Sequence, residues 1–190
     1  MIDLADAHDF AVWGAAGACL LGAAIAFAGS VDDGLARFDA AIEQYRKLQM
    51  PPVFWPSLLH LNAGILAMAG LPADGLVCID EALRVIGELP EPQMMSSELI
   101  GLKADLLLAA GNESDAELWF ERAVERADDL EAPMLQLRAS LALARRWCTH
   151  GRTDAAQTLL AAAYDRMPEG FATVDLIEAR ALLDELAGAR

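Results

Sequence analysis

The stretch GNESDAELWFERA, residues 111–123, shows the spacing that decides the fold. It has a small residue five positions after the glycine, an aromatic residue nine positions after it and an alanine twelve positions after it. The same spacing follows three other glycines, at intervals of 41, 41 and 40 residues, so that the four are Gly29, Gly70, Gly111 and Gly151. Self-similarity at a fixed period of this length is typical of repeat proteins.

Five further columns of this alignment keep their size class in all four copies. Position +5 is small, with Gly34, Gly75, Ala116 and Ala156. Position +9 is large and apolar, with Phe38, Ile79, Phe120 and Leu160. Position +12 is always alanine, at Ala41, Ala82, Ala123 and Ala163. Position −7 is small, with Gly22, Ala63, Ala104 and Ala144, and position −4 is large, with Ile25, Leu66, Leu107 and Trp147.

Helix geometry explains these columns. Residues three and four apart share a helix face, so positions −7 and −4 lie on one face of a helix that ends at the glycine. Positions +5, +9 and +12 lie on one face of the helix that follows. The glycine stands where the chain reverses, a place that often requires a left-handed backbone. The pattern predicts a helical hairpin with small residues packed against large ones, used four times.

The composition favours the same fold, because hydrophobic residues make up 55% of the chain and Ala and Leu, which are good helix formers, dominate. We predict an all-α solenoid in one domain spanning residues 1–190. Its repeats lie at about 8–48, 54–88, 93–130 and 132–166, and a capping helix follows at about 173–187. Helices are expected near 8–28, 31–48, 56–69, 72–87, 94–110, 113–129, 133–149, 153–166 and 174–187.

The columns resemble those of the tetratricopeptide repeat (TPR). The matching residues of the third copy are Ala104, Gly111, Ala116, Phe120 and Ala123. The resemblance covers about 30–166 and extends more loosely over 8–29. The period of 40–41 residues departs from the usual ~34. The resemblance implies a TPR-like superhelix whose concave face binds a protein or peptide.

The segment YDRMPEGFATVDLIEARALLDEL, residues 164–186, resembles the C-terminal end of large bacterial signalling proteins. These are class III adenylate or guanylate cyclases joined to an ATPase module, and related ATPase regulators of the LuxR type. The matching positions are Tyr164, Glu169, Gly170, Phe171, Thr173, Asp175, Leu176, Glu178, Ala179, Leu182, Leu183 and Leu186. Met167 and Pro168 depart from the pattern, and HDFAVW, residues 8–13, resembles the opening of a repeat in those proteins.

The resemblance implies a non-catalytic interaction or regulatory module of such a signalling protein. The chain has no GxxxxGK[ST] phosphate loop, and neither Lys47 nor Lys103 follows a glycine. We expect no enzymatic activity, no cofactor and no metal; Cys148 and His150 are interpreted as packing and helix-end residues. The alternative is a small-molecule sensor that uses an apolar groove near Phe27, His60 and Met68.

The net charge of −15 restricts the partners. A nucleic-acid binder needs a basic surface that replaces phosphate counterions, so DNA and RNA are not expected. An anionic membrane surface is not expected for the same reason. Three separated cysteines without a CxxC motif indicate neither a disulfide framework nor a zinc site, and they favour a cytoplasmic location.

The resemblance to the tetratricopeptide repeat implies that the first helix of each predicted repeat lines the groove. By register, the candidate partner-binding residues are Ser57, His60, Glu98, Asp105, Arg138 and Arg145. Equivalent positions of adjacent repeats are neighbours, so Glu98 should face Arg138 and Asp105 should face Arg145. Two interpretations remain open at this point: the arginines form a clamp for a peptide carboxylate, or they neutralise the acidic residues opposite them.

Residues 11–31 carry no charge and are long enough to span a bilayer. They are rich in Ala and Gly, and their flanks are acidic, which argues against a membrane span and a signal peptide. A helix that is apolar all round is covered all round. Either further repeats of a longer parent chain or a second copy of this chain would cover it. We expect self-association, as a homodimer, through the N-terminal hairpin, with Trp13, Leu20 and Phe27 in the interface.

Overall fold

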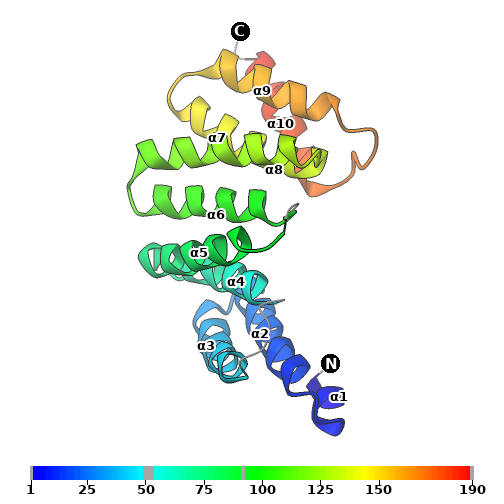
Figure 1. Ribbon diagram of the computed structural model, residues 1–190. Helices are drawn as coiled ribbons and strands as arrows, with labels where there is room; N and C mark the ends of the chain where they lie inside the picture. Colours follow the sequence, from blue (N-terminus) through cyan, green and yellow to red (C-terminus); the bar gives the residue numbers. More distant parts are fainter. Residues whose placement is uncertain (1, 49–53, 91–92, 189–190) are drawn as a thin grey trace. The chain divides into compact units, whose positions relative to one another are not determined.

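The computed structural model describes residues 2–48, 54–90 and 93–188, and within these ranges every regular element is a helix. The chain divides into two compact units (Figure 1). The first comprises residues 1–91 and 109–111, and the second comprises residues 92–108 and 112–190.

The first unit is built from adjacent helix pairs. Its helices are α1 (Ile2–Ala7), α2 (Ala11–Phe27), α3 (Val31–Lys47), α4 (Trp55–Met68) and α5 (Pro72–Gly87). Helix α2 packs against α3, and α4 packs against α5. Helix α4 also contacts α2 and α3, so the second pair lies on the first.

The second unit repeats this arrangement and ends with one extra helix. Its helices are α6 (Ser96–Ala109), α7 (Glu113–Asp129), α8 (Pro133–Thr149), α9 (Thr153–Asp165) and α10 (Val174–Gly188). Helix α8 packs against both α7 and α9, and α10 covers α8 and α9 (Figure 1). The hydroxyl of Ser97 on α6 donates to the carbonyl oxygen of Ala123 on α7 at 2.9 Å, which joins these two helices.

The predicted helices are confirmed to within a few residues, with one correction at the N-terminus. A single helix was expected from residue 8, but the chain forms α1 first and turns before α2. Asp9 adopts a left-handed φ of 59° in this turn, and the backbone N–H of Phe10 donates to the carbonyl oxygen of Ala5 at 2.8 Å. The pattern missed α1 because six residues are too few to show a period.

The four aligned glycines close helices as predicted. All have left-handed φ values: 105° at Gly29, 73° at Gly70, 81° at Gly111 and 71° at Gly151. After Gly151, the N–H of Arg152 donates back to the carbonyl oxygen of Trp147 at 2.9 Å. This bond satisfies a carbonyl at the end of α8 that has no partner within the helix.

The seam columns lie in the core. The large side chains at position +9 are at most 2% exposed: Phe38, Ile79, Phe120 and Leu160. The alanines at position +12 are at most 3% exposed: Ala41, Ala82, Ala123 and Ala163. The hairpin packing predicted from the spacing is therefore present in both units. A continuous TPR-like solenoid, and one domain over 1–190, remain predictions.

Candidate binding surfaces

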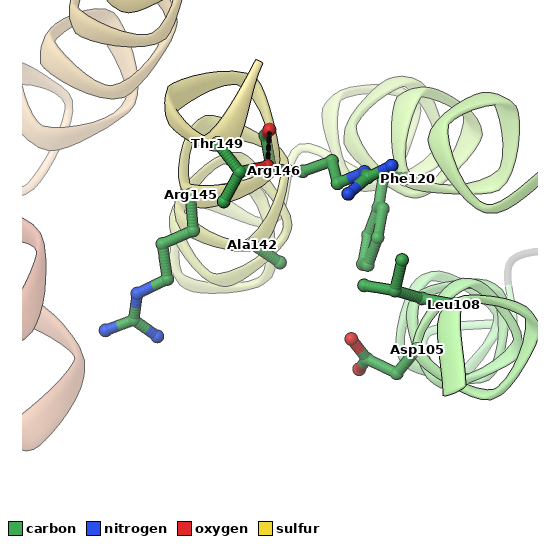
Figure 2. Close-up of a pocket in the computed structure, with 7 residues that line it drawn as sticks. All are labelled: Asp105, Leu108, Phe120, Ala142, Arg145, Arg146 and Thr149. Carbon is green, nitrogen blue, oxygen red and sulfur yellow. Dashed lines mark hydrogen bonds between the residues drawn. The ribbon is translucent and has the colours of Figure 1, made fainter. Parts of the chain in front are cut away.

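The second unit contains a pocket of about 270 Å³, shown in Figure 2. It is lined by one residue of α7 and by residues of α6 and α8: Asp105, Leu108, Phe120, Ala142, Arg145, Arg146 and Thr149. Leu108, Phe120 and Ala142 are apolar, whereas Asp105 and Arg145 lie on opposite sides in the view of Figure 2. The pocket therefore combines apolar surface with one acidic and two basic side chains.

The repeat explains why these residues meet. Asp105 and Arg145 occupy equivalent positions of successive repeats, so both point into the same space. On α8, Ala142, Arg145, Arg146 and Thr149 follow the spacing that keeps side chains on one helix face. Sequence analysis identified Asp105 and Arg145 but missed Arg146, whose column did not belong to the predicted groove.

The pKa of Asp105 is high for an aspartate whose side chain is exposed. Its side chain remains accessible to solvent, but protein surrounds the carboxyl group closely. The resulting desolvation raises its pKa from 3.8 to about 6. The carboxyl group therefore titrates near the lower end of the physiological pH range.

The two arginines of the pocket differ in how far their side chains are exposed to solvent. The Arg146 side chain is 11% exposed, and its Nη2 donates to Glu113 at 2.6 Å. This hydrogen bond lowers the pKa of Glu113. The Arg145 side chain is 54% exposed and donates from Nη2 to Glu178 on α10 at 2.8 Å. Arg145 is the pocket cation that a ligand reaches most easily.

Arg138 is held by carboxylates from two helices. It donates to Glu98 on α6 at 3.1 Å, which confirms the predicted pair. It also forms a two-pronged contact with Asp175 on α10, at 3.0 and 3.1 Å. For Arg138 the structure thus favours neutralisation within the chain over a clamp. Such exposed pairs contribute only about 0–1 kcal/mol each.

The predicted partner of Arg145 needs a correction. Asp105 and Arg145 line the same pocket, as expected, but Arg145 pairs with Glu178. The reason is that α10 packs on α8 and brings its own carboxylates to the arginines.

Ser57 and His60 lie on α4 in the first unit, and both are partly exposed. Helix α4 packs against α2, α3 and α5. Their role in partner binding remains a prediction.

The surface of α2 carries large apolar side chains that are open to solvent. Trp13 is 51% exposed, Leu20 is 48% exposed and Phe27 is 54% exposed, so all three predicted self-association residues are accessible. Trp13 contacts the Phe54 ring at a centroid distance of 5.2 Å. A smaller pocket of about 210 Å³ lies between α2 and α3, next to Leu21.

Two further expectations concern membranes and metals. None of the helices in the described ranges is long and apolar enough to cross a membrane. Within the same ranges, no group of three or more His, Cys, Asp or Glu residues is arranged to hold a metal ion. His150 lies at the end of α8, with Nδ1 3.0 Å from the carbonyl oxygen of Arg146.

The chain matches no protein family model and no curated protein.

Proposed function

We propose that the protein is a TPR-like interaction module that binds a peptide segment of a partner protein in the pocket between α6 and α8. The observation that carries this proposal is the position of Arg145, an exposed cation at the edge of an apolar pocket. Following the resemblance of residues 164–186, we place the module in bacterial cyclase–ATPase signalling proteins or related LuxR-type regulators. We propose a non-catalytic role and a cytoplasmic location.

The repeated hairpins support an interaction module. Stacked hairpins present extended surfaces because each unit contacts its neighbours in the same way. The pocket opens between α6 and α8, which are the first helices of two successive predicted repeats. In the TPR family, which the sequence resembles, this is the side of the hairpin that faces a bound peptide.

The chemistry of the pocket favours a peptide carboxylate beside an apolar side chain. Phe120, Leu108 and Ala142 accept the apolar group. Arg145 uses one of its nitrogens for Glu178, and its remaining N–H groups are free to donate to a second carboxylate. Charge-assisted bonds of this type are the stronger class of hydrogen bond.

The lining of the pocket, rather than its size, favours a peptide over a small-molecule sensor. Pockets for drug-sized ligands usually measure about 300–1,000 Å³. At about 270 Å³, this pocket lies just below that range and has room for one large side chain. In the sensor alternative, the ligand would lie near Phe27 and Met68, which are 54% and 47% exposed.

A peptide-binding assay tests the proposal. The probes are two fluorescent hexapeptide libraries with an apolar last residue, one with a free C-terminal carboxylate and one amidated. We expect binding of the free-acid library, and a loss of at least ~10-fold on amidation or on Arg145→Met, because each change removes the charge-assisted bond. Arg180→Met is the matched control, since Arg180 is an exposed arginine that pairs with Asp184 within α10.

The proposal fails if neither library binds at millimolar concentration, or if Arg145→Met and Arg180→Met bind equally well. A parallel thermal-shift screen with common metabolites addresses the sensor alternative. Stabilisation by a metabolite together with no peptide binding would replace the proposed function by that alternative.

A further inference from the structure

Helix α2 presents a compact apolar patch centred on a small residue. Ala24 is exposed, Leu20 and Leu21 lie one turn before it, and Phe27 lies one turn after it. Leu20, Leu21 and Phe27 are 48%, 46% and 54% exposed. We call these four residues the α2 face.

The exposed area is large for a surface with no partner. Trp13 and Phe10, at 51% and 55% exposed, extend the apolar surface toward the start of the helix, but they lie eleven and fourteen residues before Ala24 and outside a contact centred there. The α2 face itself offers three half-exposed large side chains, on the order of 300 Å² per copy and about 600 Å² for two copies. An interface of this size is of the weak, transient class.

The α2 face is complementary to itself. A small residue at the centre lets two helices approach closely, and the bulky residues on either side then fill the gaps. When two copies of α2 cross antiparallel about a two-fold axis at Ala24, residues three or four positions before it lie opposite residues three or four positions after it. Leu20 of one copy then meets Phe27 of the other, and Leu21 meets the small Ala28.

The distribution of charge favours a second copy of this chain as the partner of the α2 face. Each chain has a net charge of −15, so two copies repel each other over most of their surface. Residues 10–31 carry no charged side chain, so here two copies can meet without opposing like charges. A charged partner would find no ion-pair partner on this helix.

We propose that the protein forms a two-fold symmetric homodimer through the α2 face, with the helices antiparallel and crossing at Ala24. An isologous interface needs a self-complementary surface, and the α2 face has one. The modest area implies a reversible dimer with a dissociation constant of roughly 1–100 µM. This inference concerns the first unit and stands independently of peptide binding by the second.

Sedimentation velocity over roughly 1–500 µM protein tests the dimer directly. We expect dimerisation that tightens between about 0.02 and 0.3 M NaCl, because salt screens the repulsion between two acidic chains. Leu20→Glu should weaken the dimer by at least ~10-fold, since it places a charge in the apolar contact. Val77→Ser is the control, because Val77 is 67% exposed on α5 and lies outside the face.

Mixing two variants tests the antiparallel geometry. Leu20→Glu and Phe27→Lys should each be monomeric alone. A mixture of the two should form a heterodimer, because the introduced opposite charges face each other across one half of the interface. Circular dichroism confirms that each variant keeps its helices.

The dimer proposal is wrong if the wild-type chain remains monomeric at 500 µM in both salt concentrations. It is also wrong if Leu20→Glu leaves an observed dimer unchanged. If both variants are folded and monomeric but their mixture does not associate, the antiparallel crossing at Ala24 is wrong. Peptide binding by these variants should remain at the wild-type level, which separates this inference from the proposed function.

Discussion

The two units use the same columns of small and large residues but hold their helices together differently. In the first unit, glycine occupies both small columns of the first hairpin, at Gly22 and Gly34. A Cβ atom on Gly34 would lie 2.4 Å from the backbone nitrogen of Ala26, so α2 and α3 touch through their backbones. In the second unit, Ala104 and Ala116 occupy the equivalent positions, and both are fully buried.

The ion pairs of the two units also differ, in whether they link different helices. In the first unit, the pairs Arg37–Asp33 and Arg46–Glu43 lie within α3, and Arg84 of α5 pairs with Glu88, the residue that follows this helix. In the second unit, arginines of α8 join α8 to α6, α7 and α10. Size complementarity therefore forms the hairpin seam in both units. In the second unit, ion pairs between helices add to it. Helix α2 of the first unit presents an uncharged face, and the second unit has a charged pocket.

The largest expected effect comes from filling the backbone contact of the first unit. Gly34→Ala should lower the free energy of unfolding by about 3 kcal/mol or more, because the added Cβ would lie 2.4–2.7 Å from atoms of Ala26. Urea unfolding measures the loss, and hydrogen exchange should place it in α2 and α3.

Gly87→Ala is the matched control for Gly34→Ala. Gly87 is the last residue of α5, and a Cβ there would meet no atom within 4 Å. This control should be neutral or stabilising by up to about 1 kcal/mol, since alanine favours a helix. If the two substitutions change the free energy of unfolding equally, α2 and α3 do not touch through their backbones at Gly34, and this contrast with the second unit is wrong.

A smaller effect is expected from the ion pairs of the second unit. Arg138→Met should lower the free energy of unfolding by about 0.5–1 kcal/mol at low salt, because the arginine joins Glu98 and Asp175. The loss should nearly vanish in about 1 M NaCl, where charges are screened within ~3 Å.

Arg37→Met in the first unit provides the comparison, since the Arg37–Asp33 pair lies within α3 and is worth about 0.3–0.5 kcal/mol. Denaturant titrations at both salt concentrations measure the two variants. A loss for Arg138→Met that does not depend on salt would mean that packing, rather than charge, links these helices.

The smallest effect concerns the pH dependence of Asp105. Its folded-state pKa of about 6 lies above the ordinary value of 3.8, so its ionisation lowers stability as the pH rises through this window. Asp105→Asn should therefore stabilise the protein at pH 7–8, and the gain should disappear below about pH 4. Because the side chain is exposed, we expect a gain below about 1 kcal/mol.

Thermal unfolding of Asp105→Asn and the wild type between pH 4 and 8 measures this gain. Arg145 and Arg146 also line the pocket, and a cation close to a carboxylate favours its ionised form. If the variant is less stable than the wild type at pH 7, attraction to these arginines outweighs the desolvation of Asp105.

The sequence alone determined the helices, their turns and the buried seams. Each of these depends on residues within a few positions of one another, and the helical period and the glycine turns report such local geometry directly. This is why the left-handed φ of Gly70 and the burial of Ala82 were predictable from spacing. Register also predicted the pairing of Glu98 with Arg138, because equivalent positions of stacked hairpins are neighbours.

Only the tertiary structure decided which carboxylate each remaining arginine takes. Arg145 pairs with Glu178 rather than Asp105 because α10 packs on α8, a contact between segments that share no repeat register. The pocket beside Arg146 likewise arises from packing between helices. Distances between side chains on different helices depend on how the helices pack, and no local pattern in the sequence encodes them.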